Sequence, residues 1–383
     1  MYLLEHDAKE LLARHGVVVP AGYLVGRDDT IHRRALPPGP WVVKGQIAAG
    51  GRGKAGLIRK AATPQELIDR SAEILGATIM GRTVEAARVE EQIKGAEEAY
   101  VALLLDAATG GVRVIMSARG GMDVETLPAG SLHSDTTAAQ PQALGECIAR
   151  LASTFDGPMA KALGEAGSRL AHAFLGHEAL LVEVNPLFVY PDGRWIAGDA
   201  KLITDDNALP RQTALVKLVE TRAATYPDVA RKHRHGFDYV VVDPAGEIAL
   251  LTTGAGLSMM LIDELRAAGL KPYNFLDIRT GGLRGETARL TQVLEWIREG
   301  RSVKVLLVNI FAGITDLGEF SQLLVKALDA ARLEAPVVAR LIGNGLPAAR
   351  EVLASAGISL HTDLDEALAE VRKHLSRRMK AEG

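Results

Sequence analysis

The chain has 383 residues, of which 48% are hydrophobic and 24% are charged, and its formal net charge is −3. This length predicts two domains or one bilobal fold. An 18-residue apolar run and a clustered basic face are both missing, so we expect neither a membrane protein nor a nucleic-acid-binding protein. Residues 1–10 lack the basic and apolar regions of a secretory signal, which predicts a cytoplasmic protein. The single cysteine, Cys147, excludes an internal disulfide framework.

The first part of the chain predicts a helix followed by a strand, a glycine-rich loop, a second strand and a second helix. Residues 1–16 carry apolar side chains at helical spacing, and residues 41–47 form an apolar strand pattern. The second helix is expected to begin after Thr63, because Thr63-Pro64-Gln65-Glu66 combines a capping box with a proline in the first turn.

Antiparallel strands are predicted further along. Apolar residues alternate between 89 and 117 around the turn 109–111, and the turn Pro191-Asp192-Gly193 joins strands predicted at 180–190 and 194–202.

After residue 237 the pattern becomes that of a doubly wound α/β domain, in which apolar strands end in glycine-bearing turns that lead into helices. The polar and basic segment 228–235 is interpreted as an exposed linker, so we expect domains at 1–237 and 238–383. The strands are expected at 248–252, 303–310 and 337–341.

Residues 49–56 have the composition of a phosphate-binding loop. Their glycines allow close backbone approach, and Arg52 and Lys54 would neutralise phosphate charge. They do not form a Walker loop, because a GxxxxGK[ST] string is missing. The alternative to a phosphate-binding loop is a mobile surface hairpin. Lys44 within an apolar strand also predicts a nearby phosphate, because an ammonium buried without an anion is costly; a lysine that reaches solvent is the alternative.

Glu90 and Glu98, on either side of Ile93, are candidate acceptors for adenine and ribose, or else part of a solvated edge.

Asn185 and Asp199 are candidate ligands of a Mg²⁺ ion bound to nucleotide phosphates. A three-residue loop with Gly193 in the left-handed conformation places Asn185 opposite Asp199, and Glu183 opposite Lys201, on one sheet face. A two-residue loop would put Asn185 and Asp199 on opposite faces. At this stage a metal site and an ordinary cross-strand polar pair are both open.

The ten histidines show no HxH or HExxH spacing, and a GxSxG motif is missing. We therefore assign no catalytic residue to this chain alone.

Five strings in this order resemble the β subunit of succinyl-CoA synthetase, the ADP-forming succinate–CoA ligase. They are GGRGKAG at 50–56, EVNPL at 183–187, DAKLITDDNAL at 199–209, NFLDI at 274–278 and VNIFAGI at 308–314. The resemblance spans nearly the whole chain. It implies an α/β protein, with an α+β ATP-grasp domain followed by a flavodoxin-like domain built on a doubly wound parallel sheet.

The resemblance also implies roles for individual residues. The nucleotide, ATP or ADP, would be bound by Lys44, Gly51, Arg52, Gly53, Glu90, Ile93 through its backbone, and Glu98. Mg²⁺ would be bound by Asn185 and Asp199. The carboxylate substrate would meet Gly313, Ile314 and Thr315, with Thr253 and Arg279 in the same region.

In the family, a phosphoryl group passes from ATP to a histidine of a separate α subunit and then to the carboxylate, after which CoA thiol displaces phosphate. The α subunit supplies that histidine and most of the CoA site. This chain is therefore expected to work only in an αβ or α₂β₂ heteromer, and the choice between ATP and GTP stays open.

Two departures from the family pattern concern the substrate. Thr253 replaces an asparagine, and residues 277–282 read DIRTGG where the family reads DVGGG. We hypothesise that Arg279 binds a different or additional anionic group, such as that of a hydroxy-dicarboxylate or a sulfonate; the alternative is that it faces solvent or the α subunit. Residues 118–123 also resemble malate–CoA ligase β subunits.

The alternatives within the enzyme class are therefore a malate–CoA or a sulfoacetate–CoA ligase β subunit. A non-catalytic nucleotide-sensing subunit is an alternative of another class. An NAD-dependent dehydrogenase would use Gly254-Ala255-Gly256, but position 259, where a third glycine is expected, is Met259.

Overall fold

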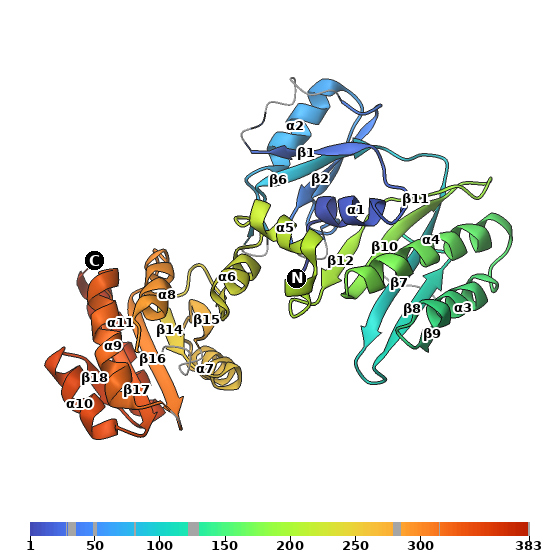
Figure 1. Ribbon diagram of the computed structural model, residues 1–383. Helices are drawn as coiled ribbons and strands as arrows, with labels where there is room; N and C mark the ends of the chain where they lie inside the picture. The colour runs from blue at the N-terminus through green and yellow to red at the C-terminus, as the bar shows by residue number, and fades with distance from the viewer. Residues whose placement is uncertain are drawn as a thin grey trace. The chain divides into compact units, whose positions relative to one another are not determined.

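The computed structural model describes residues 1–27, 29, 36–48, 52–79, 82–121, 130–278, 285–313 and 315–381. The chain forms two compact units, Met1–Val216 and Lys217–Gly383 (Figure 1). The division falls inside helix α5 (Thr213–Thr221), which follows the short 3-10 helix η3 (Leu209–Arg211). It lies upstream of the domain boundary expected at 237/238, which stays a prediction.

An antiparallel sheet covered by helix α2 forms one part of the N-terminal unit. Val43 and Val89 of the sheet pack with Leu67 and Ile74 of the helix in a buried core. The elements are β1 (Gly22–Gly26), β6 (Ala86–Glu91), β2 (Trp41–Gln46) and β3 (Ile58–Ala61), in this spatial order, with α2 (Pro64–Ile74) and the small pair β4 (Thr78–Ile79) and β5 (Arg82–Thr83).

Helix α2 begins as predicted. The Thr63 hydroxyl accepts a hydrogen bond from the Glu66 N–H. The Glu66 carboxylate accepts from the Ala62 N–H, one residue before the position that the capping-box pattern expects.

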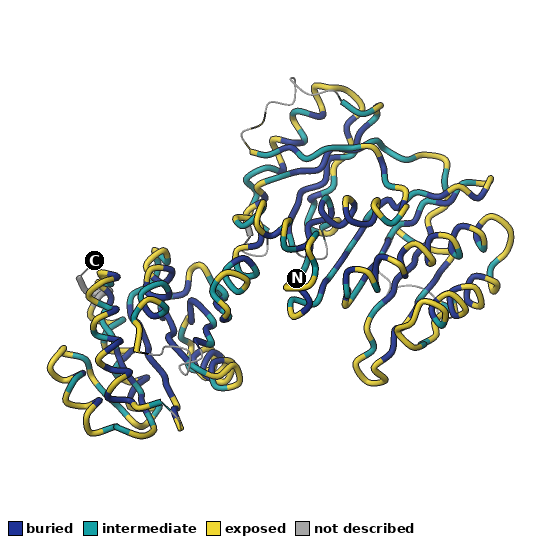
Figure 2. Tube along the Cα trace, in the orientation of Figure 1, coloured by how far each residue is buried: buried dark blue, intermediate teal, exposed yellow. Residues whose placement is uncertain are grey.

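A second antiparallel sheet carries helices α3 and α4 on one face (Figure 1). The middle strands of this sheet are largely buried, whereas its edge strand at 133–137 and the outer sides of the helices are more exposed (Figure 2). The elements are β11 (Trp195–Ala197), β10 (Ala179–Val189), β7 (Glu97–Asp106), β8 (Gly111–Ser117) and β9 (His133–Thr137), in this order, with β12 (Lys201–Thr204) also on β10, α3 (Pro141–Ala152) and α4 (Gly157–Gly176).

The register predicted for the β10 hairpin is confirmed. Gly193 has a φ of +80°, and the Tyr190 N–H donates to the Arg194 carbonyl at 2.8 Å. Glu183 pairs with Lys201. The second strand is not continuous as expected, because it breaks at 198–200. Gly198 lies so close to the Phe188 ring that a Cβ there would be 2.3 Å from a ring carbon, so the approach requires glycine.

Helix α1 (Glu5–Ala13) is shorter than the predicted 1–16 but buries the expected apolar face. Just beyond its end, His15 Nε2 is hydrogen-bonded to Nε2 of His177, the residue that caps the C-terminus of α4, at 3.0 Å. Burial, with help from His15 and Arg14, lowers the pKa of His177 to about 4. His177 is therefore neutral at pH 7, and its hydrogen bond with His15 links the end of α1 to the C-terminus of α4.

The C-terminal unit contains the predicted doubly wound sheet, with the parallel order β14–β16–β17–β18. Alternate residues of β14 face opposite cores, since Ala249 and Leu251 pack with α8 and α9 while Ile248 and Leu250 pack with α7 and α11. The elements are β14 (Ile248–Thr252), α7 (Ala255–Ala267), α8 (Ala288–Arg298), β16 (Val305–Ala312), α9 (Leu317–Ala331), β17 (Val337–Gly343), α10 (Leu346–Ser355), β18 (Ser359–His361) and α11 (Leu364–Ala381).

A side chain joins a further strand to this sheet. Strand β15 (Asn274–Asp277) pairs with β13 (Asp238–Val241), and the Asn274 side chain connects it to β14. Its Oδ1 accepts from the Leu250 N–H, and its Nδ2 donates to the Leu250 carbonyl, both at 2.9 Å. The order β15–β14–β16–β17–β18 is that of a flavodoxin-like fold.

The linker predicted at 228–235 is instead helix α6 (Pro227–His235). It ends at Gly236, which has a left-handed φ of +74°. Ala230 is buried, and the Arg231 guanidinium lies over the rings of Tyr239 and Trp296. The basic residues that suggested a solvated linker occupy the last turn of the helix, where the helix dipole favours them.

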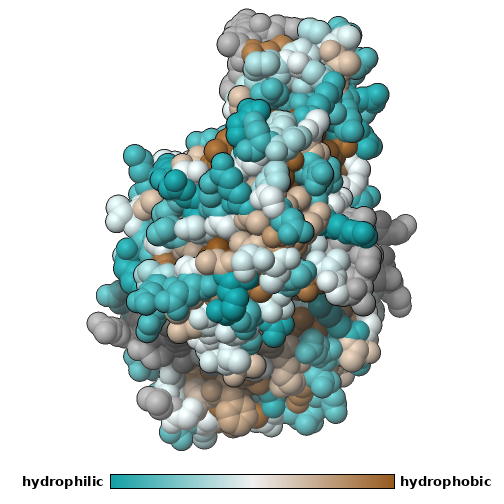
Figure 3. Space-filling model, turned by 90° about the vertical axis from the view of Figure 1, so that its right-hand side faces the viewer, coloured by the Kyte–Doolittle hydropathy of each residue, from teal (hydrophilic) through white to brown (hydrophobic). Residues whose placement is uncertain are grey.

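Hydrophilic side chains predominate on the face shown in Figure 3, and hydrophobic ones form small patches. Among the helices of the described residues, none has the length and apolar character needed to span a bilayer.

We predict that Asn274→Leu destabilises the C-terminal unit by about 2–4 kcal/mol, because it leaves both buried polar groups of Leu250 without partners. Amide hydrogen exchange at Leu250 should accelerate with the loss of stability. The same substitution at exposed Asn207 is the control. Unchanged stability in Asn274→Leu would contradict the side-chain bridge.

The N-terminal unit is predicted to lose stability as the pH falls from about 6.5 towards 4. In this window the unfolded chain binds a proton at His177 and the folded chain does not, so protonation favours unfolding. The expected loss is on the order of 2 kcal/mol. Denaturation curves at several pH values, compared with those of His177→Leu and a His233→Leu control, should show a smaller pH dependence in His177→Leu alone.

Candidate functional site

A cavity of about 980 Å³ lies in the N-terminal unit and is lined by strands of both of its sheets. Every described residue for which a nucleotide or metal role was predicted lines this cavity. These residues are Lys44, Arg52, Gly53, Lys54, Glu90, Ile93, Glu98, Asn185 and Asp199. Gly51 lies outside the described residues.

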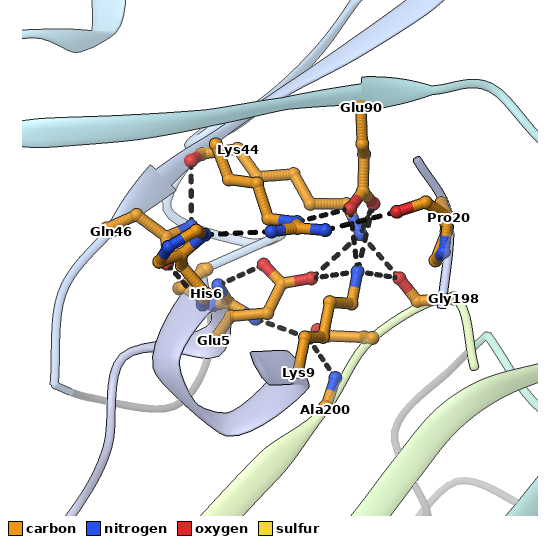
Figure 4. Close-up of polar contacts among 12 residues, drawn as sticks. Glu5, His6, Lys9, Pro20, Lys44, Gln46, Glu90, Gly198 and Ala200 are labelled. Atoms are coloured by element: carbon orange, nitrogen blue, oxygen red, sulfur yellow. Dashed lines mark hydrogen bonds and ion pairs between the residues drawn. The ribbon is translucent and has the colours of Figure 1, made fainter. Parts of the chain in front are cut away.

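Lys44 is buried in β2, and its ammonium has anionic partners within the chain. Nζ donates to Glu5 Oε1 at 3.0 Å and to the Gly198 carbonyl at 2.6 Å, and it lies 2.5 Å from Glu90 Oε1 (Figure 4). The reasoning that Lys44 requires a phosphate because it lacks an anion was therefore wrong. Helix α1 and strand β6 supply the counter-charges.

Arg52 belongs to the glycine-rich segment 49–56 and connects α1 with Asp199. Its Nη1 donates to Glu5 Oε2 at 2.5 Å, and its Nη2 donates to Asp199 Oδ1 at 2.5 Å. The two ends of the guanidinium thus hold two separate carboxylates, as its fork geometry allows.

Glu90 is 2% exposed and is not part of a solvated edge. Its carboxylate accepts from Lys9 Nζ at 2.8 Å and from Arg88 Nε at 2.8 Å, in addition to pairing with Lys44. Glu90 therefore serves as a counter-ion to three cations in this arrangement. Glu98, in contrast, is exposed at the rim of the cavity.

These contacts form one charge network, in which four cations face three carboxylates. Its members are Lys9, Lys44, Arg52 and Arg88, with Glu5, Glu90 and Asp199. Burial raises the pKa of Glu5, but Arg52, Lys44 and Lys9 outweigh this and hold it well below its usual range. Burial and the nearby Glu5 raise the pKa of Asp199. Lys9 and Arg88 do not line the cavity, so within it Lys44 and Arg52 are fully paired with Glu5, Glu90 and Asp199.

Asn185 and Asp199 both face this cavity, which agrees with the register of the hairpin. Asn185 lies where the pairing of β10 with β7 shifts, and its Oδ1 accepts from the Gly121 N–H at 2.7 Å. Asp199 Oδ1 accepts from the Ala200 N–H at 2.7 Å and from Arg52. Amide and carboxylate oxygens are suitable donors for Mg²⁺.

In the described part of the chain, no group of three or more His, Cys, Asp or Glu side chains is placed to hold a metal ion. A Mg²⁺ ion at Asn185 and Asp199 would therefore take further ligands from phosphate and water, as nucleotide-bound Mg²⁺ commonly does.

Gly121 is a residue of this site that sequence reasoning did not single out. It has a φ of +72°, a conformation that side-chain-bearing residues rarely adopt, so the backbone here favours glycine. The double glycine at 120–121 was the available signal. Met122 and Asp123, from the same segment, lie outside the described residues.

The predicted carboxylate residues belong to the C-terminal unit. Thr253 and Gly313 follow the parallel neighbours β14 and β16, so both lie at the carboxyl edge of the sheet, where the strand order reverses. The Gly254 N–H donates to Asp277 Oδ1 at 2.8 Å, which fixes the turn after β14 against the end of β15. Thr315 is described and half-buried, whereas Arg279 and Ile314 lie outside the described residues.

Sequence reasoning also missed Glu5, Lys9 and Arg88. Glu5 and Lys9 are one helical turn apart in α1, and both are buried beside its apolar face. A charged pair at this spacing usually faces solvent, so its local pattern gave no sign of burial.

Known families match both parts of the chain. A family model described as an ATP-grasp domain matches residues 2–189, and one described as CoA-ligase matches residues 251–373. The NAD-dependent dehydrogenase alternative finds no support in these matches.

Curated relatives match almost the full length. The GDP-forming succinate–CoA ligase subunit beta of Thermus thermophilus is 36% identical over 97% of this chain and 98% of its own. The ADP-forming succinate–CoA ligase subunit beta 2 of Streptomyces coelicolor is 37% identical over 92% of this chain and 91% of its own.

A solved structure with a similar fold is ATP citrate lyase from Methanothrix soehngenii in complex with citrate and coenzyme A. It has a TM-score of 0.68 at 19% identity and covers 94% of this chain and 95% of that chain. The two family matches and the full-length relatives together show that this chain belongs to the family of succinate–CoA ligase β subunits, with an ATP-grasp domain followed by a CoA-ligase domain.

Proposed function

We propose that this chain is the nucleotide-binding and carboxylate-binding β subunit of an ADP-forming carboxylate–CoA ligase. The observation that carries the proposal is the cavity in which the cations Lys44 and Arg52 come together with the oxygen donors Asn185 and Asp199. Cations and oxygen donors in this combination suit a magnesium-bound polyphosphate. Curated relatives include GDP-forming and ADP-forming enzymes, and we propose ATP as the nucleotide.

The chain's own residues bind and orient the nucleotide. Lys44 and Arg52 hold phosphate oxygens, Gly53 allows close backbone approach, and Glu98 and the Ile93 backbone bind adenosine. Glu90 contributes by holding Lys44 in place. Mg²⁺ at Asn185 and Asp199 would offset phosphate charge as the γ-phosphoryl group leaves ADP.

The remaining chemistry needs an α subunit. Its histidine nitrogen accepts the γ-phosphoryl group and passes it to a substrate carboxylate oxygen, which gives an acyl phosphate. The CoA sulfur then attacks the acyl carbon, phosphate leaves, and the thioester forms. We propose that the α subunit binds most of the CoA, that the assembly is αβ or α₂β₂, and that it is cytoplasmic.

The carboxylate is proposed to bind at the carboxyl edge of the C-terminal sheet, at Thr253, Gly313, Ile314, Thr315 and Arg279. Backbone N–H groups in glycine-bearing turns can receive an anion there. The substrate is a small carboxylic acid, either succinate or an acid with an additional polar group, such as malate or sulfoacetate.

We predict that Lys44→Met weakens binding of Mg-ATP by about tenfold to a hundredfold, because it removes a desolvated charge that contacts phosphate. Isothermal titration of the purified chain measures the affinity, and circular dichroism checks the fold. Lys161→Met is the matched control, because Lys161 is an exposed lysine of the same unit outside this cavity. Equal affinities in Lys44→Met and wild type would refute the nucleotide site.

The substrate is tested with the purified complex of this chain and its α subunit, assayed with succinate, malate and sulfoacetate. If Arg279 binds an additional anionic group, Arg279→Gly should shift kcat/KM towards succinate, relative to the preferred acid, by about tenfold. An unchanged ratio between the acids would assign Arg279 to solvent or to the α subunit.

A further inference from the structure

Glu5 is a buried carboxylate in the wall of the cavity. It is the first residue of α1, is 2% exposed, and lines the same cavity as the proposed nucleotide residues. A carboxylate so deeply buried is costly unless cations compensate it. Its position between the cations therefore calls for an explanation.

The two oxygens of Glu5 are shared among three cations. Oε1 lies 2.8 Å from Lys9 Nζ and 3.0 Å from Lys44 Nζ, while Oε2 lies 2.5 Å from Arg52 Nη1. A carboxylate and a phosphate both offer neighbouring oxygens that accept charge-assisted hydrogen bonds. The Glu5 carboxylate thus binds Lys44 and Arg52 in the way that the oxygens of a nucleotide phosphate would bind them.

Arg52 links this contact to the proposed metal ligand. Its other end, Nη2, holds Asp199 Oδ1 at 2.5 Å. A guanidinium at this distance repels a divalent cation that approaches the same carboxylate. Arg52 must therefore move away from Asp199 before Mg²⁺ can bind there fully.

We propose that Glu5 is a positioning residue that acts as a resident counter-anion, competing with nucleotide phosphate for Lys44 and Arg52. Phosphate binding draws Arg52 away from Glu5 and Asp199, and the release of Asp199 opens the metal site. The inference rests on the proposed nucleotide-binding function and adds to it a reason for metal and nucleotide to bind together. A phosphate beside Glu5 meets a like charge, and Mg²⁺ relieves that repulsion.

Lys9 sets the strength of this competition. It contacts Glu5 and Glu90 but does not line the cavity, so it neutralises the carboxylates from behind. Removing the charge of Glu5 should strengthen phosphate binding, and removing the charge of Lys9 should weaken it. A purely structural role for the network predicts weaker binding in both variants.

The experiment measures the affinity of the full chain for ADP by isothermal titration, once with EDTA and once with excess Mg²⁺. Glu5→Gln is expected to bind metal-free ADP about tenfold more tightly than wild type, with a smaller gain from Mg²⁺. Lys9→Met is expected to bind metal-free ADP more weakly. Asp7→Asn is the matched control, because it removes a buried acid of the same helix that does not line the cavity.

Unchanged or weaker metal-free binding in a folded Glu5→Gln overturns the inference. If Glu5→Gln does not fold, the Mg²⁺ dependence of Lys9→Met decides. The inference expects a larger gain from Mg²⁺ in this variant than in wild type, because Glu5 is less neutralised, and an equal loss of affinity with EDTA and with Mg²⁺ overturns it. Failure of the wild-type chain to bind ADP under either condition would instead refute the proposed nucleotide site.

Discussion

A buried carboxylate between two cations, Glu5 between Lys44 and Arg52, is the interaction on which the geometry of the nucleotide cavity depends. Without it, a lysine from one strand and an arginine from the glycine-rich segment would repel each other at close range. With it, both cations are held together and aimed into the cavity. Removing one member of such a buried group typically costs several kcal/mol, roughly 3–5. The network therefore stabilises the fold of the N-terminal unit and also forms part of the cavity wall.

The same network joins the two sheets of the N-terminal unit. Lys44 and Glu90 come from the sheet that carries α2, whereas Gly198 and Asp199 belong to the break between β11 and β12. Helix α1 supplies Glu5 and Lys9 between them, and its far end is fastened by the contact of His15 with His177. One short helix thus supplies charges to the network around the cavity, and the His15–His177 hydrogen bond holds its opposite end against α4.

Local chemistry made part of this structure predictable. The hairpin register followed from one left-handed glycine, Gly193, and the helix start followed from Thr63. The partners of Lys44 were not predictable, because Glu5 and Glu90 are distant in sequence and each resembled a surface charge. Helix α6 was missed for a related reason: its basic last turn resembled a linker, and only the tertiary contact of Arg231 with Tyr239 and Trp296 distinguishes it.

In the C-terminal unit, two side chains that fix the fold lie close in sequence to residues proposed to bind the substrate. Asn274 joins β15 to β14 through its amide, and Asp277 holds the turn at Gly254. The hydrogen bonds of Asn274 and Asp277 lie within the protein, and neither depends on which acid is the substrate. In the sequence, Thr253 and Arg279, at which the chain differs from the family pattern, lie within two residues of Gly254 and Asp277. Specificity can therefore change while the fold is kept.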